Sequence, residues 1–172
     1  MIDFERMLSG LVGGGVEFIV IGGMAATAHG SAHVTVDLDI VYGRTDDNIA
    51  RLASALSPLD PYLRGAPPGL PLRFDAATIK RGLNFTLTSK AGDLDVLGEA
   101  TGGGTYEALL PRSEVRQLFG LAVRFVDLET LALLRQDAVV PDTIGHSPPD
   151  GRTRGRGNSL ACATRISAST TA

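Results

Sequence analysis

Two short segments alternate aspartate with aliphatic residues, and this alternation restricts the fold more than any other feature of the chain. The first reads Asp37-Leu38-Asp39-Ile40 and the second reads Asp93-Leu94-Asp95-Val96. Successive side chains of a β-strand point to opposite faces. Each segment therefore predicts a strand with one face in the core and the other face lined by carboxylates.

The first acidic pair predicts a cation site. Asp37 and Asp39 would lie about 7 Å apart along one strand, where they repel each other unless a cation lies between them. A third carboxylate from a neighbouring strand would complete the all-oxygen site that Mg²⁺ prefers. We expect Asp95 in this role because it lies deeper in its apolar strand, with Asp93 as the reserve. The alternative is a set of solvated acids at a strand edge or a hairpin shoulder.

A pair of glycines precedes the first acidic segment. Gly22 and Gly23 follow an apolar stretch that ends at Ile21. Without Cβ atoms, two glycines between a strand and a helix let backbone N–H groups approach a phosphate. Such turns also use glycine for steric reasons alone, so the pair indicates a phosphate site only in combination with the acids.

The apolar periodicity predicts an α/β (α+β) fold, with a mixed β-sheet flanked by helices. The predicted strands cover residues 16–21, 34–41, 84–88, 93–97, 115–119 and 121–126. The predicted helices cover residues 2–11, 24–29, 45–56 with its cap, 76–81, 106–110 and 128–135. Residues 57–71 contain five prolines and two glycines and are predicted to form a loop.

The character of the chain changes near Asp137, where prolines, glycines and arginines lead into a Ser/Thr/Ala-rich end. This composition predicts a folded domain over residues 1–136 and a disordered or aberrant tail over residues 137–172, such as a shifted reading frame would produce. A single cysteine, Cys162, excludes an internal disulfide and a cysteine-based zinc cluster. With no signal peptide and no apolar run of about 20 residues, we expect a cytoplasmic protein without membrane contact.

In combination, these motifs resemble the nucleotidyltransferase superfamily related to DNA polymerase β, and most closely its minimal members and the AbiEii-type nucleotidyltransferase toxins. That family places Gly-Gly or Gly-Ser after an apolar strand and then, beyond a spacer, Asp-x-Asp inside a second apolar strand. Here Ile21-Gly22-Gly23 is followed after thirteen residues by Asp37-Leu38-Asp39-Ile40. The third acid of the family matches Leu94-Asp95-Val96, and the resemblance covers about residues 1 to 136.

The resemblance implies a polymerase-β-like core that moves an NMP from an NTP, such as ATP, to a hydroxyl acceptor. Asp37, Asp39 and Asp95 would be the catalytic carboxylates and the ligands of two Mg²⁺ ions. The residues implied to contact the nucleotide are Gly22, Gly23, Thr35 and Arg135. The acceptor stays open between RNA or tRNA, a protein hydroxyl and a small molecule such as an aminoglycoside.

The same resemblance implies a toxin–antitoxin setting with a cognate antitoxin protein. The net charge of −3 and the pI near 5.6 argue against a protein that coats nucleic acid. A local basic patch could still serve an RNA acceptor. Its candidate members are Arg64, Arg73, Lys80, Arg81 and Lys90.

Some departures from the family pattern support a second hypothesis. His33 and Val36 stand where relatives often carry Arg and Lys, and the proline-rich tail replaces a helical segment. The chain could then be a catalytically inactive module of the same fold that binds a nucleotide or a partner, or a decayed product without function. We interpret His29 as a helix-end residue, and His146 and Cys162 as inert.

Overall fold

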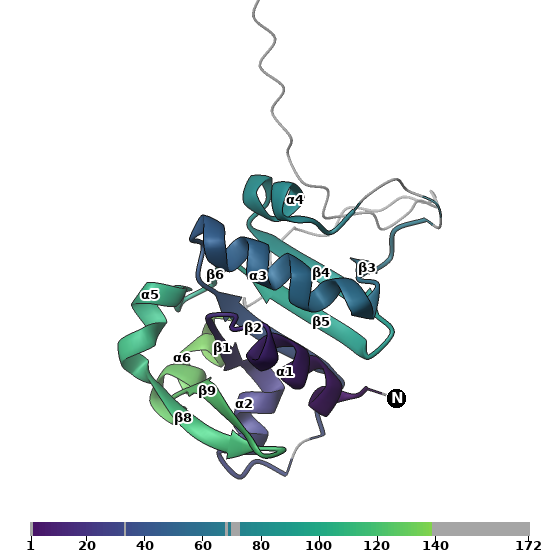
Figure 1. Cartoon of the computed structure of the whole chain (residues 1–172). Helices are drawn as coiled ribbons and strands as arrows, with labels where there is room; N and C mark the ends of the chain where they lie inside the picture. The colour runs from purple at the N-terminus through teal and green to yellow at the C-terminus, as the bar shows by residue number, and fades with distance from the viewer. Residues whose placement is uncertain (1, 33, 68, 70–72, 139–172) are drawn as a thin grey trace, which may run out of the picture. The chain divides into compact units, whose positions relative to one another are not determined.

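A seven-stranded sheet with helices on both faces forms the folded part of the chain (Figure 1). The computed structural model describes residues 2–32, 34–67, 69 and 73–138. The strands of the sheet are β1 (Phe18–Ile21), β2 (Asp37–Tyr42), β3 (Tyr62–Leu63), β4 (Asn84–Ser89), β5 (Gly92–Leu97), β8 (Ser113–Leu118) and β9 (Leu121–Val126). They lie in the order β3-β4-β5-β2-β1-β9-β8. A separate two-stranded sheet pairs β6 (Glu99–Ala100) with β7 (Gly104–Thr105).

The sheet is mixed. Strand β2 runs parallel to β5, and β1 runs parallel to β9, whereas the other neighbours are antiparallel. The predicted hairpin over residues 84–97 forms as β4 and β5. The prediction of an α/β protein with a mixed sheet flanked by helices is therefore confirmed.

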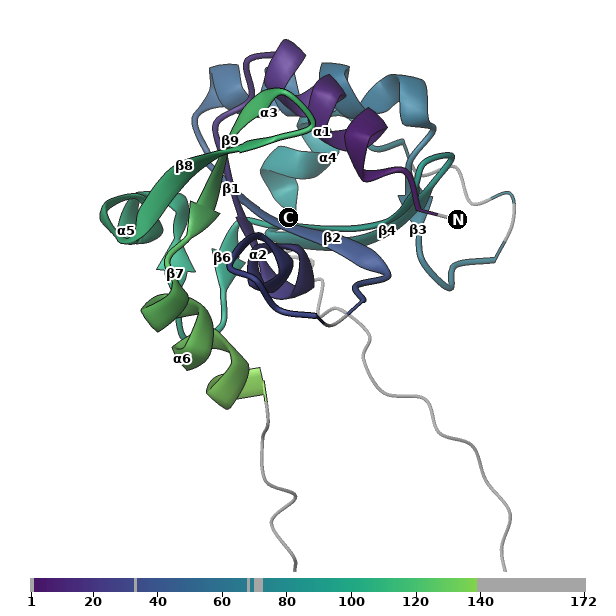
Figure 2. The same cartoon turned by 90° about the horizontal axis from the view of Figure 1, so that it is seen from below.

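Five of the six α-helices of the described residues form two layers, and α5 lies to the side (Figure 2). The six helices are α1 (Phe4–Gly13), α2 (Gly22–Ala28), α3 (Asp46–Leu56), α4 (Ala76–Arg81), α5 (Tyr106–Leu109) and α6 (Leu128–Ala138). Figure 2 shows α1, α3 and α4 on one face of the sheet and α2 and α6 on the other. Helix α2 contacts β1 and β2, and it packs on α6.

The aliphatic residues that alternate with the acids lie in the core. Leu38 and Ile40 of β2 and Leu94 and Val96 of β5 are fully buried in one apolar cluster. Burial of a side chain of this size contributes about 1.5–3 kcal/mol. The two strands are therefore anchored through one face, and the opposite face is free to carry charge.

Helix α3 begins at a well-defined cap. The Thr45 side chain accepts a hydrogen bond from the Asn48 backbone N–H at 3.3 Å, as the Thr45-Asp46-Asp47 motif predicts. The fully buried Asn48 side chain donates to the carbonyl oxygens of Glu17 (3.0 Å) and Gly43 (2.8 Å) and accepts from the Glu17 N–H (2.7 Å). Asn48 thus ties α3 to the start of β1 and the end of β2.

Two predicted boundaries near the acids are wrong. Strand β2 begins at Asp37 and not at Val34, because its pairing with β5 starts there. Val34 and Val36 are 91% and 74% exposed. Helix α2 begins at Gly22 and not at Met24, so the glycines form its first turn.

The predicted loop over residues 57–71 is also wrong in part. It contains a 3₁₀ helix, Ser57–Leu59, and strand β3, which pairs with β4 through Tyr62 and Leu63. A strand of two residues is too short for alternation to reveal it.

Helix α6 continues to Ala138, two residues beyond the predicted domain boundary, and the rest of the predicted tail lies outside the described residues. Within the described ranges, the helices are all too short or too polar to cross a membrane.

Candidate metal centre

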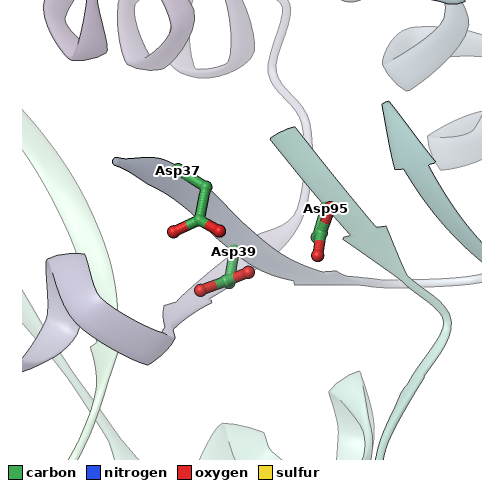
Figure 3. A group of neighbouring side chains, drawn as sticks. All are labelled: Asp37, Asp39 and Asp95. Atoms are coloured by element: carbon green, nitrogen blue, oxygen red, sulfur yellow. The ribbon is translucent and has the colours of Figure 1, made fainter. Parts of the chain in front are cut away.

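Three carboxylates from two adjacent strands converge on one face of the sheet (Figure 3). Asp37 and Asp39 extend from β2, and Asp95 extends from the parallel strand β5, where it is the register partner of Asp39. One oxygen of each carboxylate lies within 4.8 Å of the others, and all three residues are partly buried. The structure thus brings together the three acids that the sequence analysis named, on the face of the sheet that carries α2.

The cluster is electrostatically strained. Burial, followed by the charges of Asp37 and Asp95, raises the pKa of Asp39 to about 7, against the opposing effects of Arg64 and the Gly23 backbone N–H. Burial also raises the pKa of Asp95, although Arg64 opposes the rise. A proton or a cation between the carboxylates relieves this repulsion.

Gly22 makes close approach to Asp39 possible. A Cβ atom on Gly22 would overlap the Asp39 carboxylate, and the residue has a positive φ of 64°. The backbone N–H of Gly23 makes a hydrogen bond that stabilises the charged form of Asp39. The first turn of α2 therefore lies directly against the acidic cluster.

Thr35 occupies the space beside Gly23, where a Cβ atom would overlap the Thr35 hydroxyl. That hydroxyl donates to the Asp37 carbonyl oxygen (3.1 Å) and lies 3.3 Å from Asp37 Oδ1. Of the residues predicted to contact a nucleotide, Gly22, Gly23 and Thr35 lie beside the carboxylates. The side chain of Arg135 lies outside the described residues.

Sequence reasoning missed the pairing of Arg64 with the acids. Its guanidinium Nη2 lies 3.1 Å from Asp95 Oδ1, and its Nε lies 3.3 Å from Asp93 Oδ2. Asp93, the reserve ligand, is thus engaged by Arg64 outside the cluster. A signal in the sequence is weak, because Arg64 follows a two-residue strand in a proline-rich stretch.

Several members of the predicted basic patch pair with acidic side chains. Arg64 pairs with two acids, Lys80 pairs with Asp46, and Lys90 pairs with Asp60. Three of its five members thus have acidic partners in the structure.

The histidines supply no further ligand among the described residues. His29 caps the end of α2, and its Nε2 lies 2.8 Å from the Val126 carbonyl oxygen, which agrees with a structural role. His33, His146 and Cys162 lie outside the described residues.

The donor set fits a hard divalent cation. The donor atoms of Asp37, Asp39 and Asp95 are all carboxylate oxygens, which are the ligands that Mg²⁺ and Mn²⁺ prefer. The like charges that raise the pKa of Asp39 would be neutralised by such an ion. The geometry of the cluster is therefore compatible with a bound divalent cation.

Comparison with known proteins adds no family assignment: neither the family models nor the curated proteins include a match to this chain.

Proposed function

We propose that this chain is a metal-dependent nucleotidyltransferase that moves an NMP from an NTP to a hydroxyl acceptor. The observation that carries the proposal is the convergence of Asp37, Asp39 and Asp95 within 4.8 Å, directly beside the glycine-rich start of α2. A mixed sheet with helices on both faces is compatible with the polymerase-β-like core that the family resemblance implies.

In this proposal Asp37, Asp39 and Asp95 hold Mg²⁺, with two ions expected. Mg²⁺ supplies charge neutralisation at the phosphates and lowers the pKa of a bound hydroxyl. Asp95, on the strand beside Asp39, would help orient or deprotonate the acceptor hydroxyl. Gly22 and Gly23 leave the space in which the donor phosphates would approach the carboxylates.

The substrates and the setting belong to the same proposal. ATP or another NTP is the donor, and RNA or tRNA, a protein or a small molecule is the acceptor. A cognate antitoxin would be the partner, and the cytoplasm would be the compartment. The paired basic residues favour an acceptor that needs few contacts with cationic side chains.

Transfer of label from each α-labelled NTP to total RNA, protein or small molecules in the presence of Mg²⁺ tests the proposal. Asp39→Ala is expected to abolish transfer. Asp60→Asn, at an exposed aspartate outside the cluster, serves as the control and should keep full activity. Equal activity of the two variants would overturn the proposal.

One observation favours a second candidate, an inactive module of the same fold that binds a nucleotide or a partner. Val36, at a position where relatives often carry Lys, is 74% exposed and supplies no cation next to Asp37. Calorimetric titration with Mg·ATP, performed beside the transfer assay, separates the two candidates. Binding without any labelled product would favour the module.

A further inference from the structure

Arg64 is held on the sheet at four points next to the acidic cluster. Its backbone N–H donates to the Thr86 carbonyl oxygen at 3.0 Å. Its Nη2 donates to the Leu87 carbonyl oxygen and to Asp95 Oδ1, both at 3.1 Å, and its Nε lies 3.3 Å from Asp93 Oδ2. The side chain is 32% exposed. Arg64 is therefore a fixed part of the sheet surface.

The contact with Leu87 matters because it anchors the guanidinium to the backbone of β4. A planar guanidinium presents its N–H donors in a rigid fork. With Nε facing the carboxylate of Asp93 and one N–H of Nη2 donating to the carbonyl of Leu87, the other N–H of Nη2 is directed at Asp95. An ammonium group on a flexible chain would not impose the same direction.

Asp95 needs such a restraint. It faces the charges of Asp37 and Asp39 across the strand pair, and like charges in contact push a carboxylate away. The guanidinium of Arg64 attracts Oδ1 of Asp95 and opposes this repulsion.

We propose that Arg64 is a positioning residue that orients the Asp95 carboxylate for binding a divalent cation together with Asp37 and Asp39. The inference rests on the proposed metal-dependent function. In this proposal β3 contributes to the site, because pairing of this two-residue strand with β4 places Arg64 beside β4. Partners that orient metal ligands typically change metal affinity by roughly tenfold to a hundredfold.

A double-mutant cycle on cation binding tests this role without any activity measurement. The full-length chain and the variants Asp95→Asn, Arg64→Gln and the double variant are titrated with Mn²⁺, and the free ion is followed by electron paramagnetic resonance. Asp95→Asn is expected to weaken Mn²⁺ binding by roughly tenfold or more in the wild-type background. In the Arg64→Gln background the same change is expected to cost less than about threefold, because Asp95 is no longer oriented.

Equal losses in the two backgrounds would overturn the positioning role and leave the proposed function intact. Absence of Mn²⁺ binding by the wild-type chain would instead overturn the proposed function, and the inference with it. Arg64→Lys supplies the charge-matched background. There, the loss of Mn²⁺ affinity caused by Asp95→Asn is expected to lie between the losses in the wild-type and Arg64→Gln backgrounds. A loss as large as in the wild type would show that the positive charge alone is sufficient and would overturn orientation by the guanidinium fork.

Discussion

Gly22 and Asp39 lie so close together that a Cβ atom on Gly22 would overlap Asp39 Oδ2. The contact links the first turn of α2 to the centre of the acidic cluster. Gly22 also has a positive φ. Glycine is therefore required at this position both for its backbone conformation and for its lack of a side chain.

Replacement of Gly22 by Ala is expected to displace the Asp39 carboxylate. The variant should lose cation binding and at least about 2 kcal/mol of unfolding free energy, since it combines an overlap with an unfavourable φ. Gly30→Ala is the matched control, because Gly30 also has a positive φ but open space around its Cβ position. It should cost about 1 kcal/mol and leave Mn²⁺ binding unchanged. Calorimetric melts measure the loss of stability in both variants, and Mn²⁺ titrations measure the loss of cation binding. Equal Mn²⁺ affinity in the two variants would contradict the prediction.

The raised pKa of Asp39 predicts how stability depends on pH in the absence of divalent cations. The folded-state pKa of about 7 lies above the ordinary value of 3.8, so the folded protein holds this proton more tightly than the unfolded chain. The contribution of Asp39 is therefore full below about pH 4 and is lost as the pH rises through about 7. Urea titrations in EDTA at pH 5 and pH 8 should show a loss on the order of 2 kcal/mol that Asp39→Asn removes. A similar pH dependence in Asp39→Asn would contradict the assignment.

Metal removal should distinguish Asp95 from Asp93. Saturating Mg²⁺ is expected to stabilise the wild-type chain by about 2.7 kcal/mol at a hundredfold excess over Kd, and EDTA should reverse the effect. Asp95→Asn should lose most of this stabilisation because it removes one of the three converging ligands. Asp93→Asn should lose less of it, since Asp93 lies outside the cluster and acts only through its contact with Arg64. Equal loss of this stabilisation in both variants, measured by the shift of Tm, would show that Asp95 is not the third ligand.

The buried Asn48 side chain predicts a large effect on stability that is independent of the acids. Asn48→Ala removes the partners of the Glu17 N–H and the Gly43 carbonyl group and should cost about 3 kcal/mol. Thr45→Ala removes only the cap of the same helix and should cost about 1 kcal/mol. Chemical denaturation of the two variants measures the difference. A cost below that of Thr45→Ala would show that other groups replace the Asn48 contacts.

Much of this architecture follows from local patterns in the sequence. The alternation around Leu38 and Leu94 predicts two half-buried strands, and the structure has both. The cap at Thr45 and the start of α6 at Asp127 follow from residue type, and in each case the side chain accepts a hydrogen bond from the backbone N–H three residues later.

Other features depend on pairing between distant segments, which local patterns do not contain. The strand order and the register of Asp39 with Asp95 arise from long-range packing. Arg64 acquires its role only when β3 pairs with β4. Asn48 looks like an ordinary helix residue until β1 and β2 place the backbone groups of Glu17 and Gly43 around it.

The placement of the acids and the aliphatic residues on opposite faces of β2 and β5 has an evolutionary consequence. Substitutions among the acids change chemistry while the apolar packing behind them stays intact. A lineage built on this sheet can therefore lose, exchange or regain a ligand set and still inherit the same shape. Conversely, persistence of the shape in a descendant says little about whether its chemistry has survived.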